Sequence, residues 1–159
     1  RGVVVKVIAE LSKALVKVVE GQVADLEFEG RKYSKKDLEF IHLNKTASLI
    51  RASILCGAMI GGAGKSVMRK LERYGENLGM AFQIIDDILD ITLTKKKLGK
   101  TPKKDIAQKK ATYPRLIGLE NSRKLAQLKI VQSIKALQGL GKTYNILRSI
   151  AEHLGERSV

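Results

Sequence analysis

The sequence predicts an all-α fold, a bundle of long helices that forms a single domain over residues 1–159. Apolar residues recur every three or four positions along most of the chain, which is the spacing of helices that bury one face. The chain contains only 2 prolines, so its helices can run without interruption. Hydrophobic residues make up 44% of the 159 positions, enough for a sizeable core, and no convincing strand pattern is present.

The expected helices can be justified in chain order. The first shows apolar residues at helical spacing, among them Val4, Ile8 and Leu15. A capping sequence, Ser34-Lys35-Lys36-Asp37, opens the second helix, and the run Gly61-Gly62-Ala63-Gly64 ends it. The expected ranges are about 3–27, 34–60, 66–93 and, after a polar loop at 95–105, two or three helices over 107–157 with breaks near Gly118 and 139–141.

The formal net charge of +14 indicates attraction to polyanions or to ligands that carry phosphate, although a solvated basic surface gives the same charge. A nucleic-acid partner is one reading of this charge, but the chain lacks zinc-finger, KH and RRM signatures. The run Gly61-x-x-Gly64-Lys65-Ser66 does not have the spacing of a nucleotide-binding phosphate loop, and it follows a helix instead of a strand.

Other signals concern the class of protein and its compartment. No apolar run reaches the roughly 18 residues that a membrane span needs. The single cysteine, Cys56, excludes a disulfide framework, and we expect a buried thiol in a reducing compartment. The opening Arg1-Gly2-Val3 resembles the middle of a helix and shows no secretory signal, so we expect Arg1 to be an arbitrary or processed start.

Three carboxylates gather on one stripe of the third expected helix. At about 100° per residue, Asp86 and Asp90 are about 40° apart, Gln83 and Gly79 fall on the same side, and Asp87 lies at one edge. Like charges at this spacing repel each other, so a cation between them is expected. Oxygen ligands alone suit Mg²⁺, and the absence of a side chain at Gly79 would leave space beside the ion.

A solvated acidic helix face is the alternative interpretation of these carboxylates. The residues that flank the acids are too apolar for an exposed helix, which favours the metal site. These flanking residues are Phe82, Ile84, Ile85, Ile88, Leu89 and Ile91.

A basic segment follows the acidic stripe. Its lysines are Lys95, Lys96, Lys97, Lys100, Lys103, Lys104, Lys109 and Lys110. Ammonium groups beside a magnesium site are suited to bind a diphosphate, because they take the phosphate oxygens that the metal leaves. Taken singly, each lysine is better explained by a solvated surface than by a role in the site, except Lys100, which follows Gly99 at the turn of the loop.

The motifs of the chain, taken in order, resemble those of the trans-type (all-E) polyprenyl diphosphate synthases. They are Gly21-Gln22-x-x-Asp25, His42-x-x-Lys45-Thr46, Tyr74-Gly75-x-x-Leu78-Gly79, the segment Phe82-Gln83-Ile84-Ile85-Asp86-Asp87-Ile88-Leu89-Asp90, Leu98-Gly99-Lys100, Lys103-Lys104-Asp105 and Lys110-Ala111-Thr112-Tyr113-Pro114. The resemblance covers essentially the whole chain, corresponds to the C-terminal half of that family, and is most similar to its geranylgeranyl diphosphate synthases. It implies an isoprenoid-synthase-type helical bundle.

Some features depart from the family pattern. Ala47 replaces the glycine that often follows Lys-Thr, Glu20 stands where many members have glycine, and the charge of +14 is unusually high. The first aspartate-rich motif of the family, and the upstream residues that hold isopentenyl diphosphate, are absent from the chain. We therefore expect the chain alone to be inactive.

The resemblance implies that an allylic diphosphate, held by Mg²⁺, ionises and condenses with isopentenyl diphosphate. It assigns Asp86 as the principal metal ligand, with Asp87 and Asp90 bound directly or through water. The resemblance also implies that Lys45 and Lys100 bind the diphosphate, and that Thr46 and Gln83 line the allylic pocket, where they position the substrate and steady the cation. Asp105 and Lys110 are weaker candidates for the site. For Gln22 and Asp25 the alternatives are a site role and inter-helix hydrogen bonding, and for His42 a structural role is expected.

Three hypotheses follow for the whole protein. The first is a working prenyltransferase of which this chain is a fragment or a split part. The second is a non-catalytic partner subunit of such an enzyme, and the third is a basic helical protein that binds nucleic acid. The resemblance favours the first, with a homodimer or the missing N-terminal half as partner, and is compatible with the cytoplasm or the stroma of a plastid-type organelle.

Overall fold

The structure, a computed structural model, describes residues 2–97 and 110–157. Within these ranges every regular element is helical, so the predicted all-α class is confirmed. The elements are α1 (Gly2–Glu27), α2 (Lys35–His42), a π-helical segment η1 (Leu43–Ala47), α3 (Ser48–Ile60), α4 (Lys65–Lys97), α6 (Tyr113–Ile117), α7 (Leu119–Ala136), a 3₁₀ turn η2 (Lys142–Tyr144) and α8 (Asn145–Glu156).

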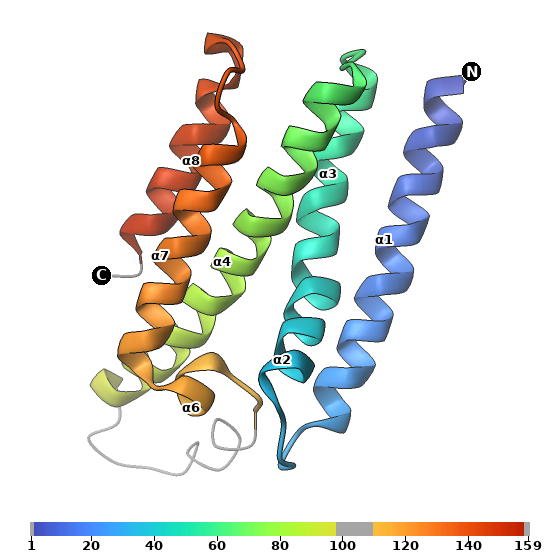
Figure 1. Cartoon of the computed structure of the whole chain (residues 1–159). Coiled ribbons are helices and arrows are strands. Elements are labelled where there is room, and N and C mark those ends of the chain that lie inside the picture. The colour runs from blue at the N-terminus through green and yellow to red at the C-terminus, as the bar shows by residue number, and fades with distance from the viewer. Residues whose placement is uncertain (1, 98–109, 158–159) are drawn as a thin grey trace.

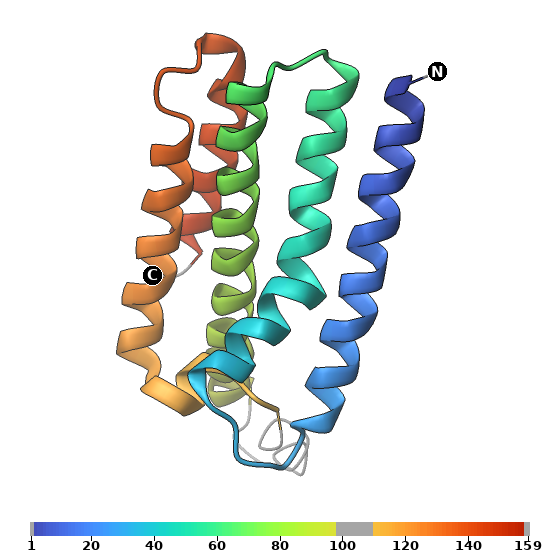
Figure 2. The same ribbon diagram turned by 45° about the vertical axis from the view of Figure 1, so that its right-hand side comes forward.

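The long helices stand side by side with α4 near the middle (Figures 1 and 2). Helix α1 packs on α3, α3 packs on α4, and the other side of α4 packs on α7, which in turn carries α8. The short helices α2 and α6 lie together at one end of the bundle, beside the C-terminal part of α4. This end also holds most of the predicted site residues that the structure describes.

Helix α4 supplies the largest share of the core because it has neighbours on several sides. Its fully buried side chains include Tyr74, Ile84, Ile85 and Ile88. Burying side chains of this size contributes about 1.5–3 kcal/mol each. The hydroxyl of Tyr74 also donates a 2.6 Å hydrogen bond to the carbonyl of Leu147, which fixes α4 against α8.

The predicted starts and breaks mostly coincide with observed ones. Ser34 and Asp37 form the expected capping box at the start of α2. Gly118 has φ +84° between α6 and α7, a conformation that side-chain-bearing residues rarely adopt. The prediction that residues 95–97 begin a loop is wrong, because α4 continues to Lys97. Lysine is a good helix former, and no glycine or proline interrupts the chain before Gly99.

The predicted helix over 34–60 is one continuous α-helix only in part. It consists of α2, the π-helical segment η1 and α3, which follow one another without a break. A π-helical turn contains more residues than an α-helical turn and is frequent at functional sites. The segment Leu43–Ala47 contains Lys45 and Thr46, so the irregular turn coincides with two predicted site residues.

Helix α1 has two apolar faces. It buries Ala14, Gly21 and Ala24 against its neighbours. The apolar positions that predicted the helix lie on another face and are exposed, for example Ile8 at 58% and Leu15 at 56%. At about 100° per residue this exposed face is centred about 170° around the axis from the buried one. Its large apolar residues are Val4, Val5, Ile8, Leu15, Val16, Val19, Val23 and Leu26.

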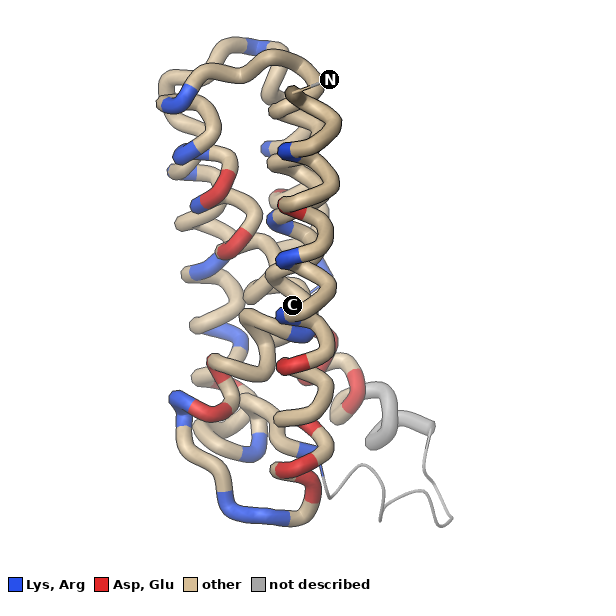
Figure 3. The backbone as a smooth tube through the Cα atoms, turned by 90° about the vertical axis from the view of Figure 1, so that its right-hand side faces the viewer, with Lys and Arg blue, Asp and Glu red and all other residues tan. Residues whose placement is uncertain are grey.

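The charges of the chain are widely distributed. Figure 3 shows basic residues along the whole length of the bundle, which favours a solvated basic surface over a single cationic patch. No helix in the described part of the chain has the length and apolar character that a membrane crossing requires.

Candidate functional site

The site is built around the π-helical segment η1, which packs between α1 and α4. A Cβ atom at Gly21 of α1 would collide with the backbone nitrogen of Lys45, and a Cβ atom at Gly79 of α4 would lie 2.5 Å from the Cα atom of Ala47. Contacts this short are sterically forbidden, so both positions require glycine for the wider turn to fit. The expectation that Gly79 leaves open space beside a metal is therefore wrong, because Ala47 fills that space.

Two consecutive residues of η1 face the two neighbouring helices. The ammonium group of Lys45 pairs with Oδ2 of Asp25 on α1 at 2.6 Å. The hydroxyl of Thr46 donates a 2.7 Å hydrogen bond to Oε1 of Gln83 on α4. Three motifs that are distant in the sequence are thus connected by side-chain contacts, and Asp25 makes an inter-helix bond that orients Lys45.

The three aspartates of α4 do not share one environment. Asp86 and Asp90 are exposed, whereas Asp87 is only 5% exposed and faces the interior. Among the described residues, no group of three or more carboxylate, histidine or cysteine side chains is arranged to hold a metal. The stripe therefore divides into an exposed pair, one helical turn apart, and a buried member.

Asp87 accepts hydrogen bonds on both of its oxygens. The side-chain amide of Gln83 donates to Oδ1 at 3.4 Å, and the backbone N–H of Tyr113 donates to Oδ2 at 3.2 Å. Burial outweighs these two hydrogen bonds and raises the pKa of Asp87 from 3.8 to about 7. Repulsion from Asp86 and Asp90 raises the pKa further.

His42 lies against the same carboxylate from the end of α2. Its Nε2 is 3.5 Å from Oδ2 of Asp87, and its ring lies 5.2 Å from the ring of Tyr113, centroid to centroid. The Nδ1 atom of His42 is buried and has no hydrogen-bond partner among the described residues. Burial lowers the pKa of His42 from 6.5 to about 3, so the imidazole is neutral at physiological pH.

The remaining predicted residues lie around this network or outside the described residues. Lys110 is exposed, and its backbone carbonyl accepts a hydrogen bond from Arg115. Gln22 is half-buried on α1. Lys100 and Asp105 lie outside the described residues.

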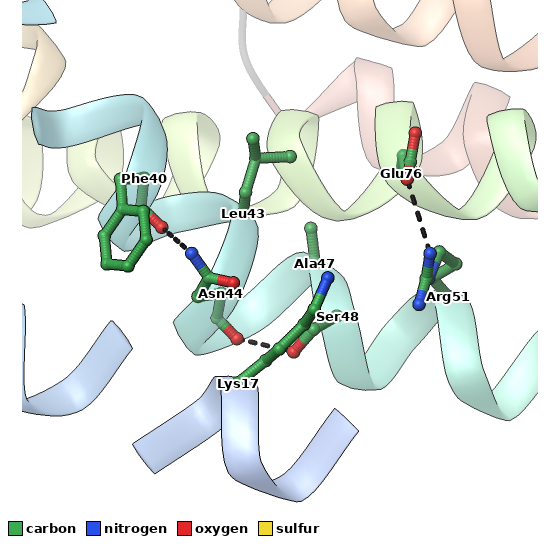
Figure 4. Close-up of a pocket in the computed structure, with 8 residues that line it drawn as sticks. All are labelled: Lys17, Phe40, Leu43, Asn44, Ala47, Ser48, Arg51 and Glu76. Atoms are coloured by element: carbon green, nitrogen blue, oxygen red, sulfur yellow. Dashed lines mark hydrogen bonds and ion pairs between the residues drawn. The ribbon is translucent and has the colours of Figure 1, made fainter. Parts of the chain in front are cut away.

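A separate pocket lies beside η1 and is shown in Figure 4. Its walls come from α1, α2, η1, α3 and α4 and include neither Lys45 nor Thr46. At one end Arg51 contacts three acids of two helices, with distances of 3.2 Å to Glu10, 3.1 Å to Glu72 and 3.6 Å to Glu76. This cluster ties α3 to α1 and α4 and serves the packing of the bundle. The lining residues are Lys17, Phe40, Leu43, Asn44, Ala47, Ser48, Arg51 and Glu76.

Known proteins are similar to this chain in sequence and in fold. A family model described as Polyprenyl synthetase matches residues 2–147. The chain belongs to the polyprenyl synthetase family. The resemblance identified from the motifs is thereby confirmed.

Two curated members of the polyprenyl synthetase family show how much of a relative this chain represents. A dimethylallyltranstransferase of Fischerella ambigua is 43% identical over 156 residues, which are 96% of this chain and 45% of that protein. A geranylgeranyl diphosphate synthase of Cyanophora paradoxa is 44% identical over 133 residues, which are 82% of this chain and 44% of that protein. The chain spans about half the length of the curated relatives it matches, or less.

A solved structure supports the fold. A geranyltransferase from Helicobacter pylori, complexed with magnesium and isoprenyl diphosphate, matches with a TM-score of 0.77 and 30% identity. The match covers 97% of this chain and 51% of that chain. The isoprenoid-synthase-type bundle expected from the motifs is therefore confirmed.

Tyrosines of the polyprenyl synthetase chain contribute to the site in a way that the motifs did not predict. The hydroxyl of Tyr33 donates to the carbonyl of Thr112 at 3.1 Å and accepts from its N–H at 3.0 Å. Together with the bond from the Tyr113 N–H to Asp87, these contacts hold the segment that leads into α6. The sequence gives no signal for them, because the groups at Thr112 and Tyr113 belong to the backbone.

Proposed function

We propose that this chain is one half of a prenyltransferase that condenses an allylic diphosphate with isopentenyl diphosphate to a longer, geranylgeranyl-type product. The observation that carries the proposal is the stripe on α4, where exposed Asp86 and Asp90 follow Gln83, the partner of Thr46. Membership of the polyprenyl synthetase family supports the reaction. The name of the Cyanophora paradoxa relative, a geranylgeranyl diphosphate synthase, supports the product class.

Asp86 and Asp90 would hold Mg²⁺. Both carboxylates are exposed on one face of α4, one turn apart, and they offer only oxygen donors. Mg²⁺ is usually bound through one or two carboxylates together with substrate phosphates, and it keeps several waters, so this pair fits the ion. The magnesium in the Helicobacter pylori complex supports the choice of metal. When bound, Mg²⁺ would neutralise negative charge on the leaving diphosphate.

The residues of the chain itself bind and orient the substrate. Lys45, oriented by Asp25, would donate to a diphosphate oxygen, and Lys100 would do the same from the lysine-rich segment. The allylic C–O bond breaks with its electron pair going to the diphosphate, the isopentenyl double bond attacks the resulting cation, and a proton is then lost. Oxygens of Thr46 and Gln83 would face the allylic cation and stabilise its charge.

The second apolar face of α1 supports a site that further polypeptide completes. A helix that is apolar on two opposite sides is typical of a helix buried on both. Val4, Ile8, Val19 and Leu26 are each 58–62% exposed in this chain alone. We infer that this face packs against the rest of the polyprenyl synthetase fold or against a second subunit, as in a homodimer.

The proposal can be tested by restoring the missing part. The chain is incubated with labelled isopentenyl diphosphate, geranyl diphosphate and Mg²⁺, either alone or with the separately produced remainder of the Cyanophora paradoxa enzyme. We expect product only from the mixture, and none when the chain carries Asp86→Asn. Turnover by the chain alone would refute the proposal that it supplies only half of the active site. An inactive mixture in which the two pieces co-elute would count against the proposed reaction.

A further inference from the structure

Asp87 differs from the two aspartates beside it in the direction that it faces. It is 5% exposed, whereas Asp86 and Asp90 are exposed. Its two oxygens are engaged by groups from its own helix and from α6, and His42 of α2 lies against one of them. A carboxylate in this position connects three elements of the bundle around the site.

A ligand of a substrate-bound metal has to present an oxygen to the cleft in which the substrate lies. Oδ1 of Asp87 accepts from Nε2 of Gln83, and Oδ2 accepts from the N–H of Tyr113. Asp87 is only 5% exposed and both of its oxygens already accept hydrogen bonds, so an ion at the surface of α4 has less access to it than to Asp86. Asp86 and Asp90 are exposed on the surface of α4, where a metal can approach them without entering the interior of the bundle.

We propose that Asp87 is a positioning residue that fixes the side-chain amide of Gln83, and that it is not a ligand of the metal. The inference rests on the proposed function, because it concerns how Gln83 and Thr46 are presented to the allylic substrate. It replaces the assignment of Asp87 as a metal ligand that the resemblance implies.

The orientation of Gln83 follows from the chemistry of its neighbours. An ionised carboxylate only accepts hydrogen bonds, so it selects the NH₂ end of the amide. The carbonyl end, Oε1, is then directed to Thr46 and accepts the hydroxyl proton at 2.7 Å. The amide oxygen and the hydroxyl oxygen are thus adjacent, an arrangement that suits stabilisation of a cation. With the amide reversed, its NH₂ group would take the place of this oxygen.

The other contacts of Asp87 hold the carboxylate in place. Tyr113 donates from its backbone, so replacing its side chain by that of any residue except proline leaves the N–H donor in place. An asparagine at position 87 has one carbonyl oxygen and therefore can accept from Gln83 or from Tyr113, but its NH₂ group would face the other donor. Asp87→Asn is consequently nearly equal in size to the native residue and yet breaks the network.

The test compares Asp87→Asn with Asp86→Asn in the full chain at pH 8. The first readout is the NMR signal of the Gln83 side-chain NH₂ group in metal-free buffer. We expect Asp87→Asn to shift this signal, because an asparagine cannot accept from both Gln83 and Tyr113. Asp86→Asn should leave the signal unchanged, because Asp86 is exposed on the surface of α4.

The second readout is calorimetric binding of Mg²⁺ with inorganic diphosphate. We expect Asp86→Asn to weaken binding at least about tenfold, and Asp87→Asn to stay within about threefold of the unmodified chain. A matched control, Ser133→Ala, removes a buried hydrogen bond to the Ile130 carbonyl in α7 and should lower Tm without moving the Gln83 signal.

The outcomes separate this inference from the proposed function. An unmoved Gln83 signal in Asp87→Asn overturns the inference whatever the binding data show. A loss of Mg²⁺ binding in Asp87→Asn as large as in Asp86→Asn also overturns it. If the unmodified chain fails to bind Mg²⁺ and diphosphate, the proposed function fails, while the Gln83 signal still shows whether Asp87 positions the amide.

Discussion

The buried pair His42 and Asp87 leads to a prediction about stability and pH in the metal-free chain. Burial favours the neutral form of both groups: it lowers the pKa of His42 from 6.5 to about 3 and raises the pKa of Asp87 from 3.8 to about 7. Between about pH 4 and 6.5 the unfolded pair holds one proton, on the histidine, and the folded pair also holds one. The pair therefore adds almost no pH dependence to the free energy of unfolding in this range.

When either residue is replaced, the remaining one should make the free energy of unfolding depend on pH. In Asp87→Asn, His42 binds a proton only in the unfolded state, so the free energy of unfolding rises with pH by up to about 1.4 kcal/mol per unit until pH 6.5. In His42→Gln, Asp87 binds a proton only in the folded state, so the free energy falls with pH by a similar amount until about pH 7. The slopes persist because burial, not the partner, is the largest cause of each shift.

The assay is urea unfolding at pH 5.0, 5.5, 6.0 and 6.5 in the presence of a chelator. Over these 1.5 units we expect a gain of about 2 kcal/mol in Asp87→Asn and a loss of about 2 kcal/mol in His42→Gln, each relative to the unmodified chain. All other titrating groups are shared, so they cancel in the comparison. Parallel curves for the three proteins, or slopes of the same sign in both variants, would refute the burial of this pair.

Two further predictions concern the packing of η1 between α1 and α4. Gly79→Ala should destabilise the chain by at least about 2 kcal/mol in urea unfolding, because its Cβ would lie 2.5 Å from the Ala47 backbone. A Cβ atom at Gly57 would have nothing within 4 Å, so Gly57→Ala should instead stabilise α3 by about 0.5–1 kcal/mol. Equal effects at the two glycines would contradict the close packing of η1 against Gly79. Lys45→Gln should weaken binding of diphosphate with Mg²⁺ about tenfold, whereas Lys135→Gln, on the exposed surface of α7, should have little effect. Equal losses in both lysine variants would indicate a general charge effect.

Much of the fold could be predicted because its signals are local. The helical spacing of apolar residues, the cap at Ser34 and the glycine at 118 each act through their immediate neighbours, and the corresponding helix starts and breaks are present in the structure. The spacing does not indicate which apolar face is covered, however. Ile8 and Leu15 predicted α1 correctly and yet remain exposed on its outer face.

The part of the site that could not be predicted depends on tertiary contacts. The π-helical turn forms where Gly21 and Gly79, from two different helices, leave room for it, and nothing within residues 43–47 indicates the wider turn. A helical projection placed Asp87 at the edge of the acidic stripe, but it could not show that His42 and the backbone of Tyr113 lie at that edge. These neighbours determine that Asp87 faces inward.

The most direct test of the central claim is calorimetric titration of inorganic diphosphate into this chain with and without Mg²⁺. The account predicts binding that requires Mg²⁺, that weakens at least about tenfold in Asp86→Asn, and that is unchanged in Glu152→Gln, which removes an exposed acid of α8. Binding of equal strength without Mg²⁺, or equal losses in the two variants, would show that the chain attracts diphosphate through its basic surface alone and would contradict the account.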